Sequence, residues 1–481
     1  MTPSPSRSLI GSALLLLGAS TLAAQARPAT ADPLAAAIDA KAPAYAAVAR
    51  RIWEFAEVGY QEEKSSALLQ EQLRAAGFTV QAGVAEIPTA FVATYGSGKP
   101  VIAIIGEFDA LPGLSQDAIP VRKILADGGP GHGCGHHLFG TAAVAASIAV
   151  KDWLASSRRS GTLRFLGTPA EEGGGGKIYM IRAGLLKDVD AAITWHPGDV
   201  NQVTRATTLA NNSAKFRFKG LSAHAAAAPE AGRSALDGVE AMNAMVNLMR
   251  EHVPAETRIH YIITSGGKAP NVVPDFAEAY YYARHSDMRV LDGIWERIIN
   301  AAKGAALGTG TDVEFELVNS VYNVMPNDAL ADVMQRALDK VGGFPYTAEE
   351  QAFAEKIRTS LTGTLPPVDA ATRIYPAETG VSSGSTDMGD VSWVVPTVQL
   401  SAATWVPGTP AHSWQAVAAG GMSIGSKGMV VAAKTMALTA RELFTTPGEL
   451  TKARAEFERR LGGFVYKSRV GDRKPPLDYR R

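Results

Sequence analysis

Three apolar stretches of strand length, each ending in charged or turn-forming residues, set the frame for the fold. They are "PVIAIIGEFDALPG" (100–113), "GTLRFLGTPAEEGGGG" (161–176) and "AAITWHPGD" (191–199). Helical patterns lie between them, as in "LFGTAAVAASIAVKDWLA" (138–155). Continuous apolar strands that alternate with helices are typical of a mostly parallel sheet with both faces covered. We therefore expect an α/β domain in which helices flank a mostly parallel sheet.

A different rhythm runs from residue 212 to residue 322. Its order is strand, helix, strand, strand, helix, strand, from "SAKFRFKG" to "DVEFELVNSVY". This order is the ferredoxin-like split unit, which is a domain in its own right. The α/β pattern then resumes with "PTVQLSAATWVPGTPAHSW" (396–414). We therefore predict a catalytic domain in two parts, 27–211 and 323–481, with an α+β lid domain inserted at 212–322.

The first 26 residues have the features of a secretory signal peptide. Arg7 precedes the apolar run "SLIGSALLLLGASTLA", and "AAQA" ends at Ala26 in the small-residue pattern of a cleavage site. A membrane anchor would need about 20 apolar residues without that small-residue stop. We expect an exported protein, periplasmic or secreted, with no later membrane span. The 47 basic and 47 acidic side chains cancel, which gives no long-range field for nucleic acid or an anionic membrane.

The only cysteine of the chain, Cys134, lies in "GHGCGHHLFGTAA" (131–143) beside three of the nine histidines. A single thiol in an exported protein cannot form an internal disulfide. Three interpretations stay open from the motif alone: a reactive thiol, a buried small side chain, or part of a metal site. Cys134 and His136, two residues apart in an extended loop, are suited to approach one ion, but two ligands do not make a site.

Further candidate ligands follow the predicted strands. Ligand sites in open α/β sheets gather beyond the carboxyl ends of the strands. Asp109, Glu171, Glu172 and His196 all stand at such ends, and His412 follows the strand near 397. Taken singly, each is more often a capped or hydrogen-bonded loop residue than a ligand. Taken together, they favour a metal site.

Seven motifs in order resemble a known family. They are "GHGCGHHLFGTAA", "TPAEEGGGGK", "WHPGD", "GLSAHAAAAPEAGRSALD", "APNVVPDFAEAYYYAR", "GSTDMGDVSWVVPTVQL" and "TPAHSWQ". The chain is similar to the dimetal amidohydrolases and metallopeptidases related to aminoacylases and bacterial carboxypeptidases, in the branch of the auxin-conjugate and hippurate hydrolases. The likeness covers most of the chain, and the family fold of a catalytic α/β domain with an inserted dimerisation lid agrees with the order of elements described above.

The resemblance implies a role for each motif residue. Glu171 would be the general base, and Asp109 would support the ligands from behind. His224, on the lid, would reach the active site of a second copy of the chain and stabilise the oxyanion, while Asn271 and Arg284 would hold the substrate carbonyl or carboxylate. The implied ligands of two divalent ions per chain (zinc or manganese, with cobalt as a further option) are Cys134, His136, Glu172, His196 and His412.

The implied function is metal-dependent hydrolysis of the amide between an acyl or aroyl group and an amino acid. A p-aminobenzoyl-glutamate-like or N-acyl amino acid substrate and a homodimer formed through the lid are expected. A dipeptidase or aminopeptidase with the same site, a non-catalytic metal-binding protein and a thiol enzyme are the alternatives.

Three further features are not assigned a role in this reaction. His137 stands where relatives carry Asp or Asn, and Asp387 would support the site or cap a turn. The basic tail "GDRKPPLDYRR" (471–481) is expected to be solvated.

Overall fold

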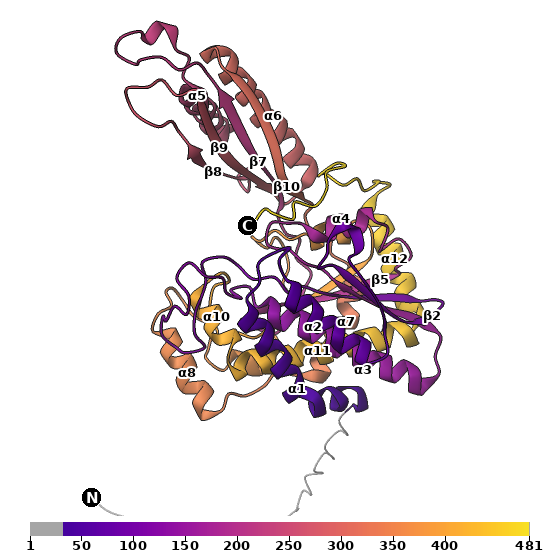
Figure 1. The fold of residues 1–481 in the computed structure, drawn as a ribbon. Helices are drawn as coiled ribbons and strands as arrows, with labels where there is room; N and C mark the ends of the chain where they lie inside the picture. Colours follow the sequence, from indigo (N-terminus) through magenta and orange to yellow (C-terminus); the bar gives the residue numbers. More distant parts are fainter. Residues whose placement is uncertain (1–31, 481) are drawn as a thin grey trace, which may run out of the picture. The chain divides into compact units, whose positions relative to one another are not determined.

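The computed structural model describes residues 32–480. The signal peptide predicted for residues 1–26 lies outside the described residues. From Pro33 onward the chain forms one compact unit. Its strands make two sheets, one of seven strands and one of four (Figure 1).

The seven-stranded sheet has the order β1-β2-β4-β3-β5-β11-β6. Its four central strands, β4, β3, β5 and β11, run parallel, and only β2 and β6 oppose the other strands of this sheet. The mostly parallel sheet predicted from the sequence is therefore confirmed. The strands are β1 (Thr79–Ala82), β2 (Phe91–Ser97), β3 (Val101–Gly106), β4 (Gly161–Gly167), β5 (Ala191–Gly198), β6 (Gln202–Thr204) and β11 (Thr397–Ala403).

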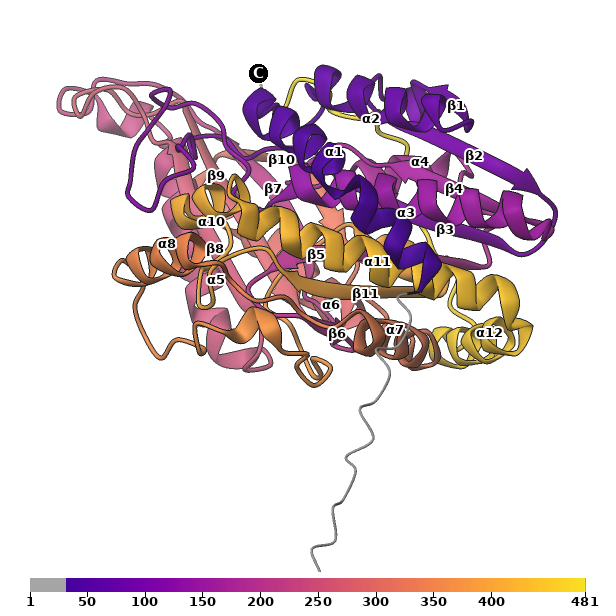
Figure 2. The ribbon, with the colours of Figure 1, turned by 90° about the horizontal axis from the view of Figure 1, so that it is seen from below.

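Helices cover both faces of this sheet because the central strands are apolar on both faces. In β3, Ile102 and Ile104 pack into one core cluster, while Ala103 and Ile105 pack into another on the opposite face. Figure 2 shows α1, α3 and α11 crossing the first face. On that side lie α1 (Pro33–Phe55), α2 (Glu63–Ala75), α3 (His136–Ser157), α7 (Asp328–Val341), α11 (Ser423–Thr445) and α12 (Pro447–Leu461), and on the other lie α4 (Gly176–Arg182) and α9 (Met388–Ser392). The remaining helices of this part are α8 (Ala348–Arg358) and α10 (Trp414–Gly420).

One helix of the described chain, α3, is by itself long and apolar enough to cross a membrane, and the bent pair α10–α11 passes the same test. The expectation that no stretch beyond the signal peptide is long and apolar enough to span a membrane is therefore wrong. Most of α3 is buried, because 78% of its most apolar stretch of 18 residues lies inside the protein. It packs on β3, β4 and β5 as the core helix that the pattern over 138–155 predicts.

The second sheet has the order β10-β7-β9-β8 and is antiparallel throughout. In chain order this arrangement is fourth, first, third, second, which is the order of a ferredoxin-like split unit. Two helices pack against the sheet, and their buried side chains form a separate core cluster. The elements are β7 (Ala210–Lys219), α5 (Ala235–Met249), β8 (Arg258–Ser265), β9 (Phe276–His285), α6 (Met288–Thr309) and β10 (Asp312–Val321). The domain boundaries 27–211, 212–322 and 323–481 stay predictions.

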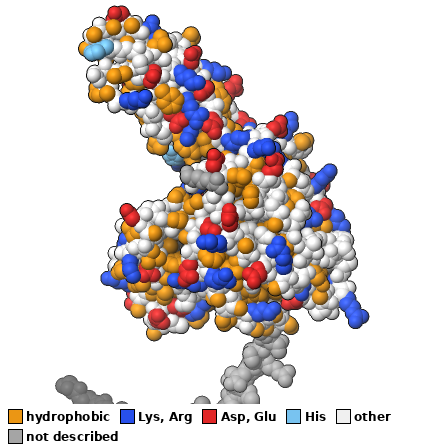
Figure 3. Space-filling view, viewed as in Figure 1, with side chains coloured by type: hydrophobic (Ala, Val, Ile, Leu, Met, Phe, Trp, Pro, Cys, Tyr) orange, Lys and Arg blue, Asp and Glu red, His pale blue; other side chains and the backbone are white. Residues whose placement is uncertain are grey.

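Charged side chains of both signs are interspersed over the face shown in Figure 3. This distribution agrees with the balanced composition of 47 basic and 47 acidic residues.

The centre of the sheet carries the stability on which the site depends. Ile104 of β3 is 0% exposed, and we expect Ile104→Ala to lower the free energy of unfolding by about 2–5 kcal/mol through lost burial and the cavity left behind. Ile124 is 50% exposed, so Ile124→Ala is the matched control and should change the free energy of unfolding by no more than about 0.5 kcal/mol. Urea unfolding followed by tryptophan fluorescence measures both. Equal losses would contradict the assignment of β3 to the core.

Candidate metal centre

The predicted site residues stand where the central strands end. Asp109 follows β3, Glu171 and Glu172 follow β4, and His196 lies near the end of β5. Because these strands are parallel, their carboxyl ends share one edge of the sheet. The loop from Gly133 to Gly135 and the loop before α10 reach the same edge.

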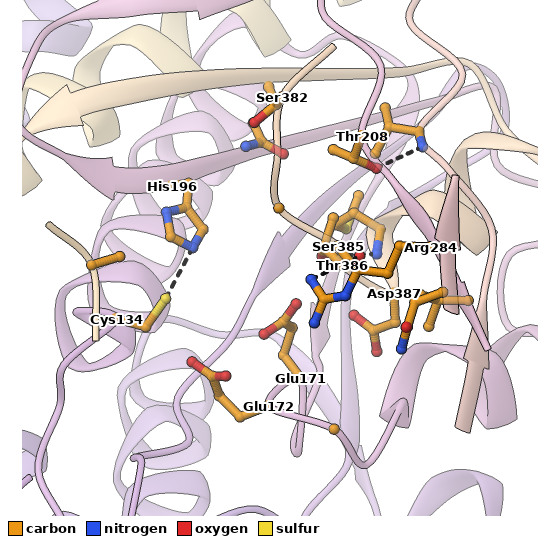
Figure 4. Close-up of a pocket in the computed structure, with 18 of the residues that line it drawn as sticks. Cys134, Glu171, Glu172, His196, Thr208, Arg284, Ser382, Ser385, Thr386 and Asp387 are labelled. Carbon is orange, nitrogen blue, oxygen red and sulfur yellow. Dashed lines mark hydrogen bonds between the residues drawn. The ribbon is translucent and has the colours of Figure 1, made fainter. Parts of the chain in front are cut away.

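The structure brings all five predicted metal ligands together. Cys134, His136 and His196 offer ligand atoms that lie within 4.8 Å of one another, and the same holds for Cys134, Glu172 and His412. Cys134 belongs to both groups. Figure 4 shows Cys134 beside His196, with the carboxylates of Glu171 and Glu172 on the adjacent loop.

His196 presents one nitrogen to this cluster. Its Nδ1 lies 2.8 Å from the carbonyl oxygen of Pro197, which only accepts, so Nδ1 carries the proton. Nε2 is then free of hydrogen and lies 3.4 Å from the sulfur of Cys134. Burial, together with the nearby His136, lowers the pKa of His196 to about 4. A neutral imidazole with a free Nε2 is the form that ligates metals.

His136 is held from behind by a carboxylate. Its Nδ1 lies 2.8 Å from Oδ1 of Asp109, and Oδ2 of Asp109 accepts a hydrogen bond of 3.0 Å from the backbone N–H of Glu172. Burial would raise the pKa of Asp109, but the interactions with His136 outweigh it and lower that pKa. An ionised carboxylate behind a ligating histidine fixes the ring and increases its basicity. The geometry therefore agrees with the supporting role predicted for Asp109.

The donor set fits divalent cations. Nε2 of His136 and Oε2 of Glu107 are buried and lie 3.2 Å apart, yet neither has a hydrogen-bond partner among the described residues. Buried polar atoms without partners are costly, and a cation beside them would satisfy both. Thiolate, imidazole and carboxylate together suit zinc and similar borderline ions.

The loop after β4 separates its two carboxylates. Ala170, just before them, has a φ of 56°, and this turn gives Glu171 and Glu172 different directions. Glu172 Oε1 lies 3.1 Å from His412 Nε2, and although burial alone would raise the pKa of Glu172, His412 and His136 hold it below its ordinary value. Burial and then repulsion from Glu107 raise the pKa of Glu171 well above its ordinary value. The two carboxylates therefore differ in their readiness to bind a proton.

His412 is set in a strained backbone conformation. Its φ is 58°, in the left-handed region that residues other than glycine rarely adopt. The backbone N–H of His412 donates to the carbonyl of Gly133 at 2.9 Å, which joins its loop to the Cys134 loop. Gly135 is needed beside it, because a Cβ at that position would lie 2.8 Å from Pro197. Strain of this kind clusters at functional sites.

A cavity of about 630 Å³ opens over the cluster. It is lined by Cys134, Glu171, Glu172, His196 and His412 from the metal side. Arg284 of β9 lines it from the four-stranded sheet. His224 and Asn271 do not line it: both are exposed, and Nδ1 of His224 accepts hydrogen bonds from the amides of Ala226 and Ala227. Within one chain, the structure brings Arg284 to the site but not these two residues.

Comparison with known proteins places the chain in a family. Residues 103–415 match the model of the peptidase family M20/M25/M40. The chain is 43% identical to one of the p-aminobenzoyl-glutamate hydrolase subunits of Escherichia coli, over 81% of its length and 86% of that protein. It is also 30% identical to the Xaa-Arg dipeptidase of Mus musculus, over 75% of this chain and 76% of that protein.

The chain belongs to the M20/M25/M40 peptidase family. The predicted kinship is thereby confirmed, and the protein is a metal-dependent hydrolase of amide bonds. Solved structures share its fold. A dinuclear metal-binding peptidase of the M20 family from Bacillus subtilis aligns with a TM-score of 0.60 at 18% identity, over 85% of this chain and 99% of that one. An aminobenzoyl-glutamate utilization protein from Klebsiella pneumoniae aligns with a TM-score of 0.58 at 19% identity, over 85% and 98%.

This M20 hydrolase has a buried charge cluster that the motifs did not reveal. Lys177 Nζ lies 2.7 Å from Glu107 and 2.6 Å from Asp387, and all three side chains are 1–2% exposed. Asp387 also accepts a hydrogen bond from the backbone N–H of Lys177, so it supports the site and does not cap α9 with its side chain. In the sequence, Glu107 directly follows an apolar strand, but Lys177 follows four glycines, a position typical of a loop residue.

The basic tail is not solvated as expected. Tyr479 Oη and the Arg480 guanidinium donate hydrogen bonds of 3.0 and 2.5 Å to the carbonyl oxygen of Glu172. Arg480 also lines the cavity. Lysine and arginine residues near a chain end favoured a solvent-exposed interpretation, and nothing in their order indicated that Tyr479 would pack edge-on against Tyr60.

Lys177 is expected to be essential for folding. Lys177→Met leaves Glu107 and Asp387 buried without their shared cation, which costs roughly 3–5 kcal/mol of unfolding free energy. The exposed Lys187 supplies the control, because Lys187→Met removes a charge without leaving buried carboxylates unpaired. Thermal unfolding of the two variants compares the losses. A Lys177 variant as stable as the Lys187 variant would show that the cluster does not need its cation.

Proposed function

We propose that this chain is an exported amidohydrolase that cleaves the amide between an acyl or aroyl group and an amino acid, with a p-aminobenzoyl-glutamate-like or N-acyl amino acid substrate. The observation that carries the proposal is the position of Glu171. It lies between the ligand cluster and a cavity that also contains the guanidinium of Arg284. The 43% identical relative, which is named as part of a p-aminobenzoyl-glutamate hydrolase, supports the substrate class.

We assign Cys134, His136, Glu172, His196 and His412 as the residues that would hold two divalent ions. Zinc or manganese, with cobalt as a further option, suits these donors. Divalent ions held by these residues would supply a nucleophile at neutral pH, because they would lower the pKa of water from about 16 to about 7 and would polarise the carbonyl. Asp109 keeps His136 oriented toward them.

Glu171 acts as the general base in this proposal. The carboxylate of Glu172 lies 3.1 Å from His412, whereas no such contact with His412 holds the carboxylate of Glu171. Glu171 takes the proton of the attacking water and returns it to the departing amine. Arg284 binds the carboxylate of the substrate, and a donor beside the carbonyl oxygen stabilises the charge that develops there.

His224 and Asn271 act in the site of a second copy of the chain in this proposal. Both lie on the lid, exposed and away from the cavity of their own chain. A homodimer formed through the lid would deliver His224 to the oxyanion in the other copy. A complex with a different type of chain is the alternative, because the relatives include another p-aminobenzoyl-glutamate hydrolase subunit of Escherichia coli, 28% identical over 54% of this chain and 62% of that protein.

A dipeptidase with the same site is the second candidate, and the relative named Xaa-Arg dipeptidase favours it. A substrate with a cationic side chain would meet the unpaired guanidinium of Arg284 in the cavity, which opposes its binding. A thiol enzyme is disfavoured because burial raises the pKa of Cys134 and keeps the thiol protonated unless a cation binds it. A storage protein would not need the base at Glu171.

Export through the signal peptide at residues 1–26 remains part of the proposal, with a periplasmic or secreted mature protein. Its support is the sequence pattern alone.

Replacing the base tests the proposal. We expect Glu171→Gln to lower kcat for N-acyl amino acids by roughly 10²- to 10⁴-fold, because the proton transfer loses its acceptor. Metal content should stay near two ions per chain. Glu71→Gln on the exposed face of α2 is the matched control and should leave kcat unchanged.

Hydrolysis of N-benzoyl-glutamate and p-aminobenzoyl-glutamate, with and without a chelator, measures these rates. Full activity in the Glu171→Gln variant, or wild-type hydrolysis that survives complete metal removal, would refute the assignment.

A further inference from the structure

The segment 462–480 runs from the end of α12 to the candidate metal centre along a series of anchors. Tyr466 donates to Asp390 at 2.7 Å. The guanidinium of Arg473 donates to the carbonyls of Leu317 and Val318 in β10. The segment thus binds both the catalytic α/β part and the base of the four-stranded sheet.

The end of this segment is fixed at the loop that carries the paired carboxylates. Gln61 donates its amide to the carbonyl of Leu477 at 2.8 Å. Tyr479 packs edge-on against Tyr60, with ring centroids 5.6 Å apart. These contacts leave little freedom for the next residue, Arg480, whose guanidinium lies at the cavity wall.

The guanidinium of Arg480 donates to an uncharged acceptor. Its terminal nitrogen donates to the main-chain carbonyl of Glu172, which also accepts a hydrogen bond from Tyr479. Its Nε is buried and has no hydrogen-bond partner, and no side-chain carboxylate of the described chain forms an ion pair with it. A guanidinium in this state is suited to bind a carboxylate with two parallel hydrogen bonds.

A second guanidinium, that of Arg284, lines the same cavity. Side chains alternate along β9, so Tyr280, Tyr282 and Arg284 share one face of the strand. The guanidinium of Arg284 lies 5.5 Å from the ring centre of Tyr282, and its buried Nε also lacks a partner.

Tyr280 continues the face of β9 that carries Tyr282 and Arg284. Its hydroxyl lies 3.3 Å from that of Tyr282. Burial and the hydrogen bond with Tyr282 raise the pKa of Tyr280.

We propose that Arg480 is a specificity-determining residue: with Arg284 it makes the cavity selective for amides of dicarboxylic amino acids, one guanidinium for each carboxylate. The inference rests on the proposed function and adds to it a substrate class and a residue outside the family motifs. It also assigns a purpose to the 462–480 segment, which delivers a charge to a site formed some three hundred residues earlier in the chain.

The test compares two substrates that differ only in the second carboxylate, N-benzoyl-glutamate and N-benzoyl-glutamine. Arg480→Gln should lower kcat/KM for the glutamate compound by roughly 10- to 100-fold, mainly through KM, and leave that for the glutamine compound within about twofold. Arg480→Lys should retain part of the preference because it keeps the charge.

Two further variants separate recognition from support of the Glu172 loop. Tyr479→Phe removes the other donor to the Glu172 carbonyl but keeps the guanidinium, so the preference for glutamate should persist. Lys474→Gln removes an 84% exposed charge from the same segment and should change neither substrate. An equal loss for both substrates in Arg480→Gln, carried by kcat, would overturn the inference and make Arg480 a positioning residue.

A binding measurement keeps this test apart from the fate of the proposed function. Calorimetric titration of the metal-loaded protein with glutarate, and with butyrate as the single-carboxylate reference, needs no turnover. Arg480→Gln should lower the affinity for glutarate at least tenfold and change the affinity for butyrate little. That result supports the inference even if no N-acyl amino acid is cleaved, whereas equal affinities of wild type and variant for glutarate would overturn it.

Discussion

The carboxylate of Asp109 joins the parts of the site. Its two oxygens bind the Nδ1 of His136 and the backbone N–H of Glu172, so one buried side chain connects the loop after β3, the start of α3 and the loop after β4. Asp109 therefore fixes the position of the paired carboxylates relative to His136 and the adjoining Cys134 loop. The fold makes it possible, because parallel strands deliver their carboxyl ends to the same edge.

Charged side chains are buried around this connection. Lys177 neutralises Glu107 and Asp387 behind the site, while the partnerless atoms of His136 and Glu107 face each other in front. Negative side chains thus outnumber positive ones at the cluster, and buried groups of one sign need a cation.

The sequence predicted the elements whose periodicity is strong and the residues that end them. The apolar runs at 101–106, 161–167 and 191–198 became β3, β4 and β5, and the polar residues after them meet at one edge. The pattern over 212–322 likewise matched the strand order of the second sheet. Lys177 was missed because a lysine after four glycines has the appearance of a loop residue, and only the packing of α4 shows that it is buried. Arg480 was missed because long-range docking of an irregular segment leaves no periodic signal.

We propose that Cys134, His136, Glu172, His196 and His412 bind divalent ions together. Anomalous diffraction from crystals of zinc-loaded protein, recorded on both sides of the zinc absorption edge, tests it most directly. We expect strong peaks in contact with Cys134 Sγ and with the nitrogens of His136, His196 and His412. Peaks only at exposed carboxylates, or an ion that Cys134 does not contact, would contradict it.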